Sequence, residues 1–114
     1  MENYDDFVQR MWMGDQDRHN LAIATLGLTG EAGEVAEKVK KHLRGDPAHN
    51  PMERPDILVR NKQIGYELGD VLFYITWLAK YHGMTLEEVK LMNMEKLNKR
   101  LDDNGTLRGD GDNR

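Results

Sequence analysis

Apolar side chains recur every three or four positions along four separate stretches of the chain, which is the period of a helix with one buried face. The first stretch, residues 4–13, is short and should end at Gly14. Two long stretches follow at residues 18–43 and 57–82, and a fourth runs from residue 86 to about 101. The pattern predicts an all-α fold with the character of a four-helix bundle.

Each long helix should bury one apolar face. The second stretch places on that face Leu21, Leu28, Ala32, Val35, Val39 and Leu43. The third places on it Ile64, Leu68, Val71, Leu72, Ile75, Leu78 and Ala79. On the fourth stretch, the residues expected to face inward are Leu86, Val89, Met92 or Met94, and Leu97.

Glycines, prolines and a capping motif separate these helices. Residues 44–56 contain three prolines and read as a loop that could cover a site. Gly83 should end the third helix. Thr85, with Glu88 three residues later, should begin the fourth through a capping box.

Three glycines stand inside the second helix, at positions 27, 30 and 33. Each weakens a helix by roughly 0.5–1 kcal/mol relative to alanine. Their presence suggests that something approaches the backbone closely. Two explanations stay open, tight helix packing and room for a ligand.

Composition narrows the class of protein. The chain has 114 residues, a formal net charge of −4 and no cysteine. One domain with a modest core is expected, which oligomerisation would help to complete. The negative charge argues against general binding to nucleic acid or to a membrane surface. Without cysteine there is no disulfide framework and no thiolate metal site. A cytoplasmic location is expected, because residues 1–10 do not resemble a signal peptide.

The longest apolar run, residues 71–79, is far too short to span a bilayer. Residues 102–114 are rich in Gly and Asp and carry almost no apolar side chains. We therefore expect a helical domain over residues 1–101 and a flexible tail over 102–114.

Two pairs of carboxylates carry the candidate chemistry. Glu31 and Glu34 are three residues apart on the second helix, and Glu67 and Asp70 have the same spacing on the third. Residues at this spacing lie on the same side of a helix. If the two helices lie side by side, four carboxylates converge, and such a cluster needs a cation. Hard divalent ions, Mg²⁺ or Mn²⁺, prefer oxygen ligands.

Other metal chemistries fit less well. Di-iron bundles need Glu-x-x-His motifs, and no Glu here has His three residues later. Zinc prefers Cys and His, and the four histidines are scattered.

Several basic and polar residues could meet a polyphosphate. Lys38 lies one turn beyond Glu34 on the same flank, and Asn93, Lys96 and Arg100 share a face of the fourth helix. An ordinary solvated helix face is the alternative explanation.

The segment from Gly30 to Glu37, followed by the segment from Glu67 to Tyr74, closely resembles the MazG-like nucleotide pyrophosphohydrolases, within the all-α NTP pyrophosphohydrolase superfamily. The family pattern is Glu-x-x-Glu, a spacer, then Glu-x-x-Asp. Thr85 to Val89, followed by Asn93-x-x-Lys96, is similar to the family's next helix. The ending, residues 105–114, resembles the tail of short phage and bacterial members.

The resemblance implies an α-helical homodimer or dimer of dimers that hydrolyses a nucleoside triphosphate between the α- and β-phosphorus, releasing the monophosphate and pyrophosphate. Nucleotide-pool control or house-cleaning would be its role. It implies Mg²⁺ held by Glu31, Glu34, Glu67 and Asp70. Asn93, Lys96 and Tyr74 would contact substrate, although simple packing is the alternative for Tyr74.

For the mechanism we expect Glu34, or Glu31, to take part in activating water. Lys38, Lys96 and Arg100 would hold the leaving pyrophosphate, and Arg114 in the tail could fold over the triphosphate. One rival is a related enzyme such as phosphoribosyl-ATP pyrophosphohydrolase. The other is a non-catalytic helical interaction module, which predicts no stabilisation by Mg²⁺.

Overall fold

The computed structural model describes residues 1–12, 14–45 and 57–104, and within these ranges it contains four α-helices and no strand. They are α1 (Tyr4–Trp12), α2 (Arg18–Arg44), α3 (Ile57–Tyr81) and α4 (Leu86–Asn104). The all-α prediction is confirmed, and each helix begins and ends within three residues of its predicted bounds. The flexible tail was predicted to begin at residue 102, which is wrong for residues 102–104, because they continue α4. The rest of the predicted tail, and most of the predicted loop, lie outside the described residues.

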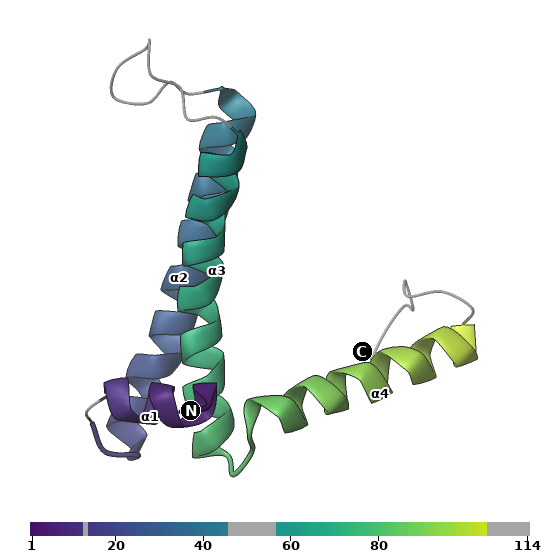
Figure 1. Ribbon diagram of the computed structural model, residues 1–114. Coiled ribbons are helices and arrows are strands. Elements are labelled where there is room, and N and C mark those ends of the chain that lie inside the picture. Colours follow the sequence, from purple (N-terminus) through teal and green to yellow (C-terminus); the bar gives the residue numbers. More distant parts are fainter. Residues whose placement is uncertain (13, 46–56, 105–114) are drawn as a thin grey trace.

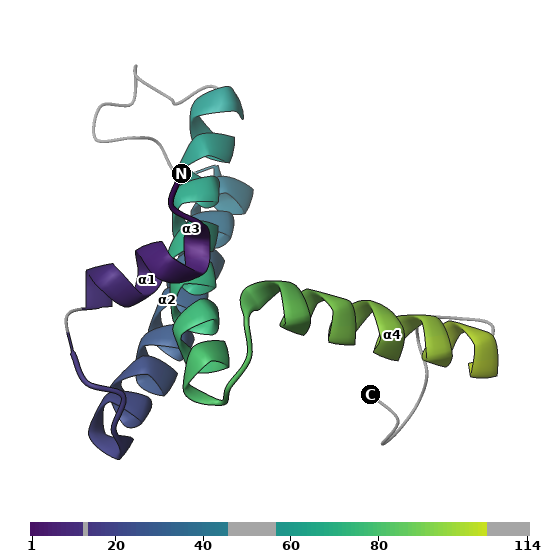
Figure 2. The same ribbon diagram turned by 60° about the horizontal axis from the view of Figure 1, so that its bottom comes forward.

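The long helices α2 and α3 lie side by side and run in opposite directions, and α1 crosses the end where α2 begins and α3 finishes (Figure 1). From that end α4 leads away from the pair, which both views show (Figure 2). Within one chain the helices therefore form a three-helix cluster with a projecting arm.

Local signals fix both ends of α2. The carboxylate of Asp17 accepts a hydrogen bond from the backbone N–H of Asn20 at 2.8 Å, as an N-cap side chain does. At the other end Gly45 adopts a left-handed conformation with φ of 69°, and its N–H bonds back to the carbonyl of His42 at 3.1 Å.

The junction between α3 and α4 also follows the sequence. Gly83 has φ of 80°, which stops α3, and Thr85 and Glu88 form the predicted capping box with two hydrogen bonds of 3.1 Å. In addition, the N–H of Leu86 donates to the carboxylate of Asp5 on α1 at 2.9 Å. The start of α4 is thus fastened to α1.

An aromatic cluster holds α1 against the helical pair. Val8, Ala24 and Trp77 are fully buried at its centre. The rings of Trp12 and Trp77 stack with centroids 4.4 Å apart, and the ring of Tyr81 stacks with that of Trp77 at 5.6 Å. Because aromatic rings bury large areas, this small cluster supplies much of the packing inside one chain.

Several apolar residues that should be buried are exposed in the isolated chain. They are Ala32, Val39, Leu43, Leu68, Leu72, Met92 and Met94. Leu68 is 53% exposed and Met94 58%. The periodicity located the apolar faces, but α4 does not fold back over α2 and α3, so nothing in the described chain covers them.

Among the described residues, no helix combines the length and the apolar character needed to cross a membrane.

Candidate functional site

Three acidic side chains meet between α2 and α3. One carboxylate oxygen from each of Glu31, Glu67 and Asp70 lies within 4.8 Å of the other two. Glu31 comes from α2, and the other two come from α3 at the predicted three-residue spacing. Glu31 and Glu67 are half-buried and Asp70 is exposed. The antiparallel pairing of the two helices therefore brings the predicted acids together; we call these three residues the acid triad.

The acid triad suits a hard divalent cation. Oxygen ligands on opposite sides of Mg²⁺ are about 4 Å apart, since each Mg–O bond is about 2.1 Å. The three carboxylate oxygens lie within 4.8 Å of one another, so small side-chain rotations would suffice to place them around one ion. Among the described residues, no lysine or arginine pairs with the acid triad. The charge is therefore not neutralised by the described part of the chain.

The negative charge gathered at the triad contributes to raised pKa values of two groups, Glu31 and Tyr4. The pKa of Glu31 is raised above its usual value, first by desolvation and then by the charges of Asp70, Glu67 and Glu34. The pKa of the Tyr4 hydroxyl, on α1, is raised by burial and by the charge of Asp70. A cation bound at the triad would lower the pKa of both Glu31 and Tyr4, because it would favour their charged forms.

Glu34, the fourth predicted ligand, lies outside the acid triad. It is exposed on α2, one turn beyond Glu31, and is close enough to contribute to the raised pKa of Glu31. Lys38 lies on the same side as Glu31, about 10 Å further along the helix axis. Glu34 and Lys38 thus flank the triad without belonging to it.

Tyr74 lies beside the triad. A hollow of about 270 Å³ is lined by Glu31, Asp70, Phe73 and Tyr74. The ring of Tyr74 also meets Trp12 edge-on at 6.1 Å, so it belongs to the aromatic cluster as well. Substrate contact and packing, the two explanations open for Tyr74, are compatible in this position.

The predicted substrate residues of α4 are not brought to the triad within one chain. Asn93 and Lys96 are exposed, and Arg100 is partly buried, on the helix that leads away from α2 and α3 (Figure 2). Arg114 lies outside the described residues. A role for α4 residues at a triad therefore requires a second copy of the chain.

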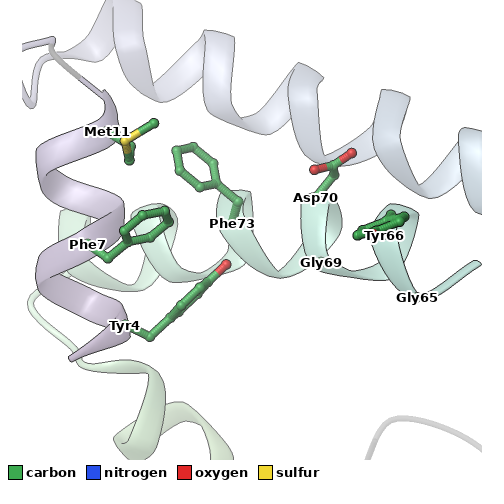
Figure 3. A pocket seen from close by; sticks show the side chains of 8 residues that line it. All are labelled: Tyr4, Phe7, Met11, Gly65, Tyr66, Gly69, Asp70 and Phe73. Carbon is green, nitrogen blue, oxygen red and sulfur yellow. The ribbon is translucent and has the colours of Figure 1, made fainter. Parts of the chain in front are cut away.

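A second hollow, of about 390 Å³, lies between α1 and α3 and was not predicted from the sequence (Figure 3). Its lining includes Tyr4, Phe7 and Met11 from α1, with Asp70 and Phe73 from α3. The three α1 residues follow one another at helical spacings of three and four, which the hydrophobic pattern showed. The apolar spacing of residues 4–13 predicted the helix but not a hollow beside it.

Comparison with known proteins places the chain in a family. The family model for the MazG nucleotide pyrophosphohydrolase domain matches residues 19–104, well over half of the chain. The protein belongs to the MazG nucleotide pyrophosphohydrolase family. Its matched region contains both carboxylate pairs, so the resemblance read from the motifs is confirmed.

Two curated relatives extend the comparison. The chain is 42% identical over 102 residues to the Gene 37 protein of Mycobacterium phage L5, which covers 89% of this chain and 83% of that protein. It is 37% identical over 76 residues to the uncharacterized protein YvdC of Bacillus subtilis (strain 168), covering 66% of this chain and 70% of that protein. No solved structure matches the chain significantly. The phage relative agrees with the predicted similarity to short phage-type members.

Proposed function

We propose that this protein is a Mg²⁺-dependent nucleoside triphosphate pyrophosphohydrolase, which cleaves a ribo- or deoxyribonucleoside triphosphate between the α- and β-phosphates. The observation that supports this most is the acid triad, with its three carboxylate oxygens within 4.8 Å, in a member of the MazG family. Nucleotide-pool control or house-cleaning in the cytoplasm is the corresponding role.

The chemistry requires water to attack the α-phosphorus while the bond to the α–β bridging oxygen breaks. A bound Mg²⁺ would neutralise phosphate charge and acidify that water. Glu31, Glu67 and Asp70 would hold the ion. Glu34 is exposed and near the triad but outside it, which fits a base that takes the proton from water.

The leaving pyrophosphate carries the charge that develops in the reaction, so cations should surround it. Lys38 is on the same side of α2 as Glu31. Asn93, Lys96 and Arg100 would join from α4 of a second copy. Arg114 remains a proposed contact from the tail.

A homodimer or a dimer of dimers would supply that second copy. On α4 the side chains of Leu91, Met94 and Leu101 share one side of the helix and are 55%, 58% and 44% exposed. Leu68 and Leu72 are exposed on α3. Projecting helices with apolar faces are best explained by a partner that covers them. We propose that α4 of one chain packs on the helical pair of the other.

The test is a panel of ribo- and deoxyribonucleoside triphosphates, with phosphoribosyl-ATP included, incubated with Mg²⁺ and scored for pyrophosphate against orthophosphate. Pyrophosphate with the matching monophosphate supports α–β cleavage. Orthophosphate as the primary product rejects it, and exclusive use of phosphoribosyl-ATP would favour the related enzyme. A chain that hydrolyses nothing and gains no thermal stability from Mg²⁺ would be the non-catalytic module.

A further inference from the structure

The junction between α3 and α4 contains a short hinge. Backbone hydrogen bonds tie the chain to α3 as far as Met84, whose N–H donates to the carbonyl of Ala79 at 2.8 Å. From Thr85 onward the backbone bonds belong to α4, beginning with the N–H of Val89 on the carbonyl of Thr85 at 3.1 Å. Met84 and Thr85 themselves lie outside both helices. The direction of α4 therefore depends on a few backbone dihedral angles, unless another contact fixes it.

Apolar packing at the base of α4 does little to fix that direction. A hollow of about 250 Å³ lies there, and its lining includes Leu28 from α2, Leu78 from α3 and Val89 from α4. Further along, α4 leads away from the helical pair, and the side chains of Leu91 and Met94 are 55% and 58% exposed (Figure 2). Among the described residues, contacts between apolar side chains thus leave room for α4 to swing.

One hydrogen bond crosses the hinge from a third helix. Asp5, in the first turn of α1, accepts it from the N–H of Leu86 at 2.9 Å, and the contact is partly buried. Leu86 is the first residue of α4, so its N–H is one of the four that a helix cannot satisfy internally. Among the hydrogen bonds formed between described residues, this one joins α4 to another helix. A carboxylate makes such a bond stronger than a neutral acceptor would.

The helix that supplies Asp5 is itself firmly seated. Val8 of α1 is fully buried at the centre of the aromatic cluster that holds α1 against α3. Tyr4, the residue before Asp5, lines the same hollow as Asp70 of the acid triad. The first turn of α1 is therefore placed beside the triad on one side and bonded to the first turn of α4 on the other.

We propose that Asp5 is a positioning residue, which sets the direction of α4 relative to the acid triad through its hydrogen bond to Leu86. This inference rests on the proposed function, in which α4 brings Asn93 and Lys96 to the triad of a second copy. Lys96 is about 15 Å beyond Leu86 along the helix axis, so a rotation of about 10° at the hinge would move it by about 3 Å. A misplacement of about 1 Å at a reacting site can already cost about 100-fold in rate.

Two variants break the bond from opposite sides. Asp5→Ala removes the acceptor, and Leu86→Pro removes the donor at the helical position where proline is best tolerated. If both act through one bond, the double variant should be no worse than the poorer single variant. Asp5→Asn keeps an acceptor oxygen and should behave as the wild type. Asp6→Ala is the matched control, because Asp6 is exposed on the same turn of α1 and carries the same charge.

The direction of α4 can be measured without reference to activity. The chain has no cysteine, so spin labels can be attached through Thr29→Cys on α2 and Glu95→Cys on α4, both at exposed positions. An excess of unlabelled chain ensures that the distances observed by pulsed electron spin resonance lie within one chain. The wild type, Asp5→Asn and Asp6→Ala should give one narrow distribution of distances. Asp5→Ala and Leu86→Pro should give a distribution at least twice as wide.

Steady-state kinetics with Mg²⁺ and a triphosphate that the wild type hydrolyses adds a second readout. In Asp5→Ala and Leu86→Pro we expect kcat to fall at least tenfold and to be restored in Asp5→Asn. The Mg²⁺-induced rise in melting temperature should persist in all of them, because the triad lies on α2 and α3. A general loss of structure would remove both properties, and far-ultraviolet circular dichroism checks that each variant stays helical.

The outcomes separate this inference from the proposed function. Distance distributions that stay narrow in both Asp5→Ala and Leu86→Pro overturn the positioning role, whether or not the wild type hydrolyses triphosphates. Broad distributions in these variants, with a wild type that hydrolyses nothing, support the positioning of α4 and reject the proposed function. Broad distributions with undiminished kcat overturn the link between the direction of α4 and the reaction. An Asp5→Asn protein as broad as Asp5→Ala overturns the hydrogen bond as the cause.

Discussion

Gly27 on α2 lies against the ring of Tyr74 on α3, so closely that a Cβ on Gly27 would be 2.5 Å from Tyr74 Cε1. The ring is itself confined, because Trp12 and Phe73 meet it edge-on with centroids 6.1 and 5.6 Å away. At this one of the three α2 glycines, tight packing is the explanation. Gly30 and Gly33 have nothing within 4 Å of a built Cβ.

Gly27→Ala should therefore destabilise the fold by about 1–3 kcal/mol, since the Tyr74 ring must move within a packed cluster. Gly30→Ala is the matched control, and it should raise the free energy of unfolding by about 0.5–1 kcal/mol. Urea denaturation measures both. A Gly27→Ala protein as stable as the wild type would mean that the ring is free to shift.

Glu31→Gln should abolish both the Mg²⁺-induced rise in melting temperature and triphosphate hydrolysis, because it removes one of the three converging carboxylates. A ligand that binds the folded state stabilises it, so the loss of metal binding appears directly in melting curves. Glu37→Gln, on the same helix but outside the triad, is the control and should keep both properties. Retention of most activity by Glu31→Gln would remove that residue from the site.

Without metal, Glu31→Gln should stabilise the protein, and the gain in melting temperature should increase with pH. The raised pKa of Glu31 means that the folded state favours the protonated carboxyl, chiefly because of desolvation. Wild type and Glu31→Gln should have similar melting temperatures in chelator below the unfolded pKa of about 4.5. As pH rises through the higher folded pKa, the wild type should lose stability relative to the variant. A constant difference from pH 4 to 7 would contradict this coupling.

Glu34→Gln tests whether Glu34 is a base rather than a ligand. Because Glu34 lies outside the acid triad, the variant should keep the Mg²⁺-induced rise in melting temperature and lose turnover by about 100-fold or more. Loss of the thermal shift would instead make Glu34 a metal ligand. Undiminished turnover would leave it without a role in the reaction.

If the proposed oligomer forms through α4, the double variant Leu91→Lys and Met94→Lys should be a monomer that is still helical, since it places two charges on the exposed apolar side of α4. Light scattering after size-exclusion chromatography measures the mass. Asp15→Lys changes the net charge by the same amount at an exposed site and should leave the mass unchanged. A wild-type chain that is monomeric at all concentrations would reject the dimer.

Local signals predicted the helices because they act within a few residues. The capping box at Thr85 and Glu88 and the left-handed Gly83 need no information from elsewhere in the chain. Burial is different, because it depends on which surfaces meet. Leu68 and Met94 lie on apolar faces but are exposed, since the direction of α4 was not encoded in its own periodicity.

The candidate site also has a part that could be predicted from the sequence and a part that could not. The spacing of Glu67 and Asp70 placed two acids on one side of α3, and pairing with α2 added Glu31. The hollow lined by Tyr4 and Phe7 could not be predicted, because helical spacing does not distinguish an aromatic face that packs from one that leaves space beside it. Only the angle at which α1 crosses α3 decides between them.

The stack of Trp12 on Trp77 has a practical consequence. These are the two tryptophans of the whole chain, and their centroids are 4.4 Å apart, one on α1 and the other on α3. Indole fluorescence and the tryptophan bands of the near-ultraviolet circular dichroism spectrum therefore both originate at this one contact. Detachment of α1 from α3 would change the two signals together, so it can be followed in the wild-type protein without an added label.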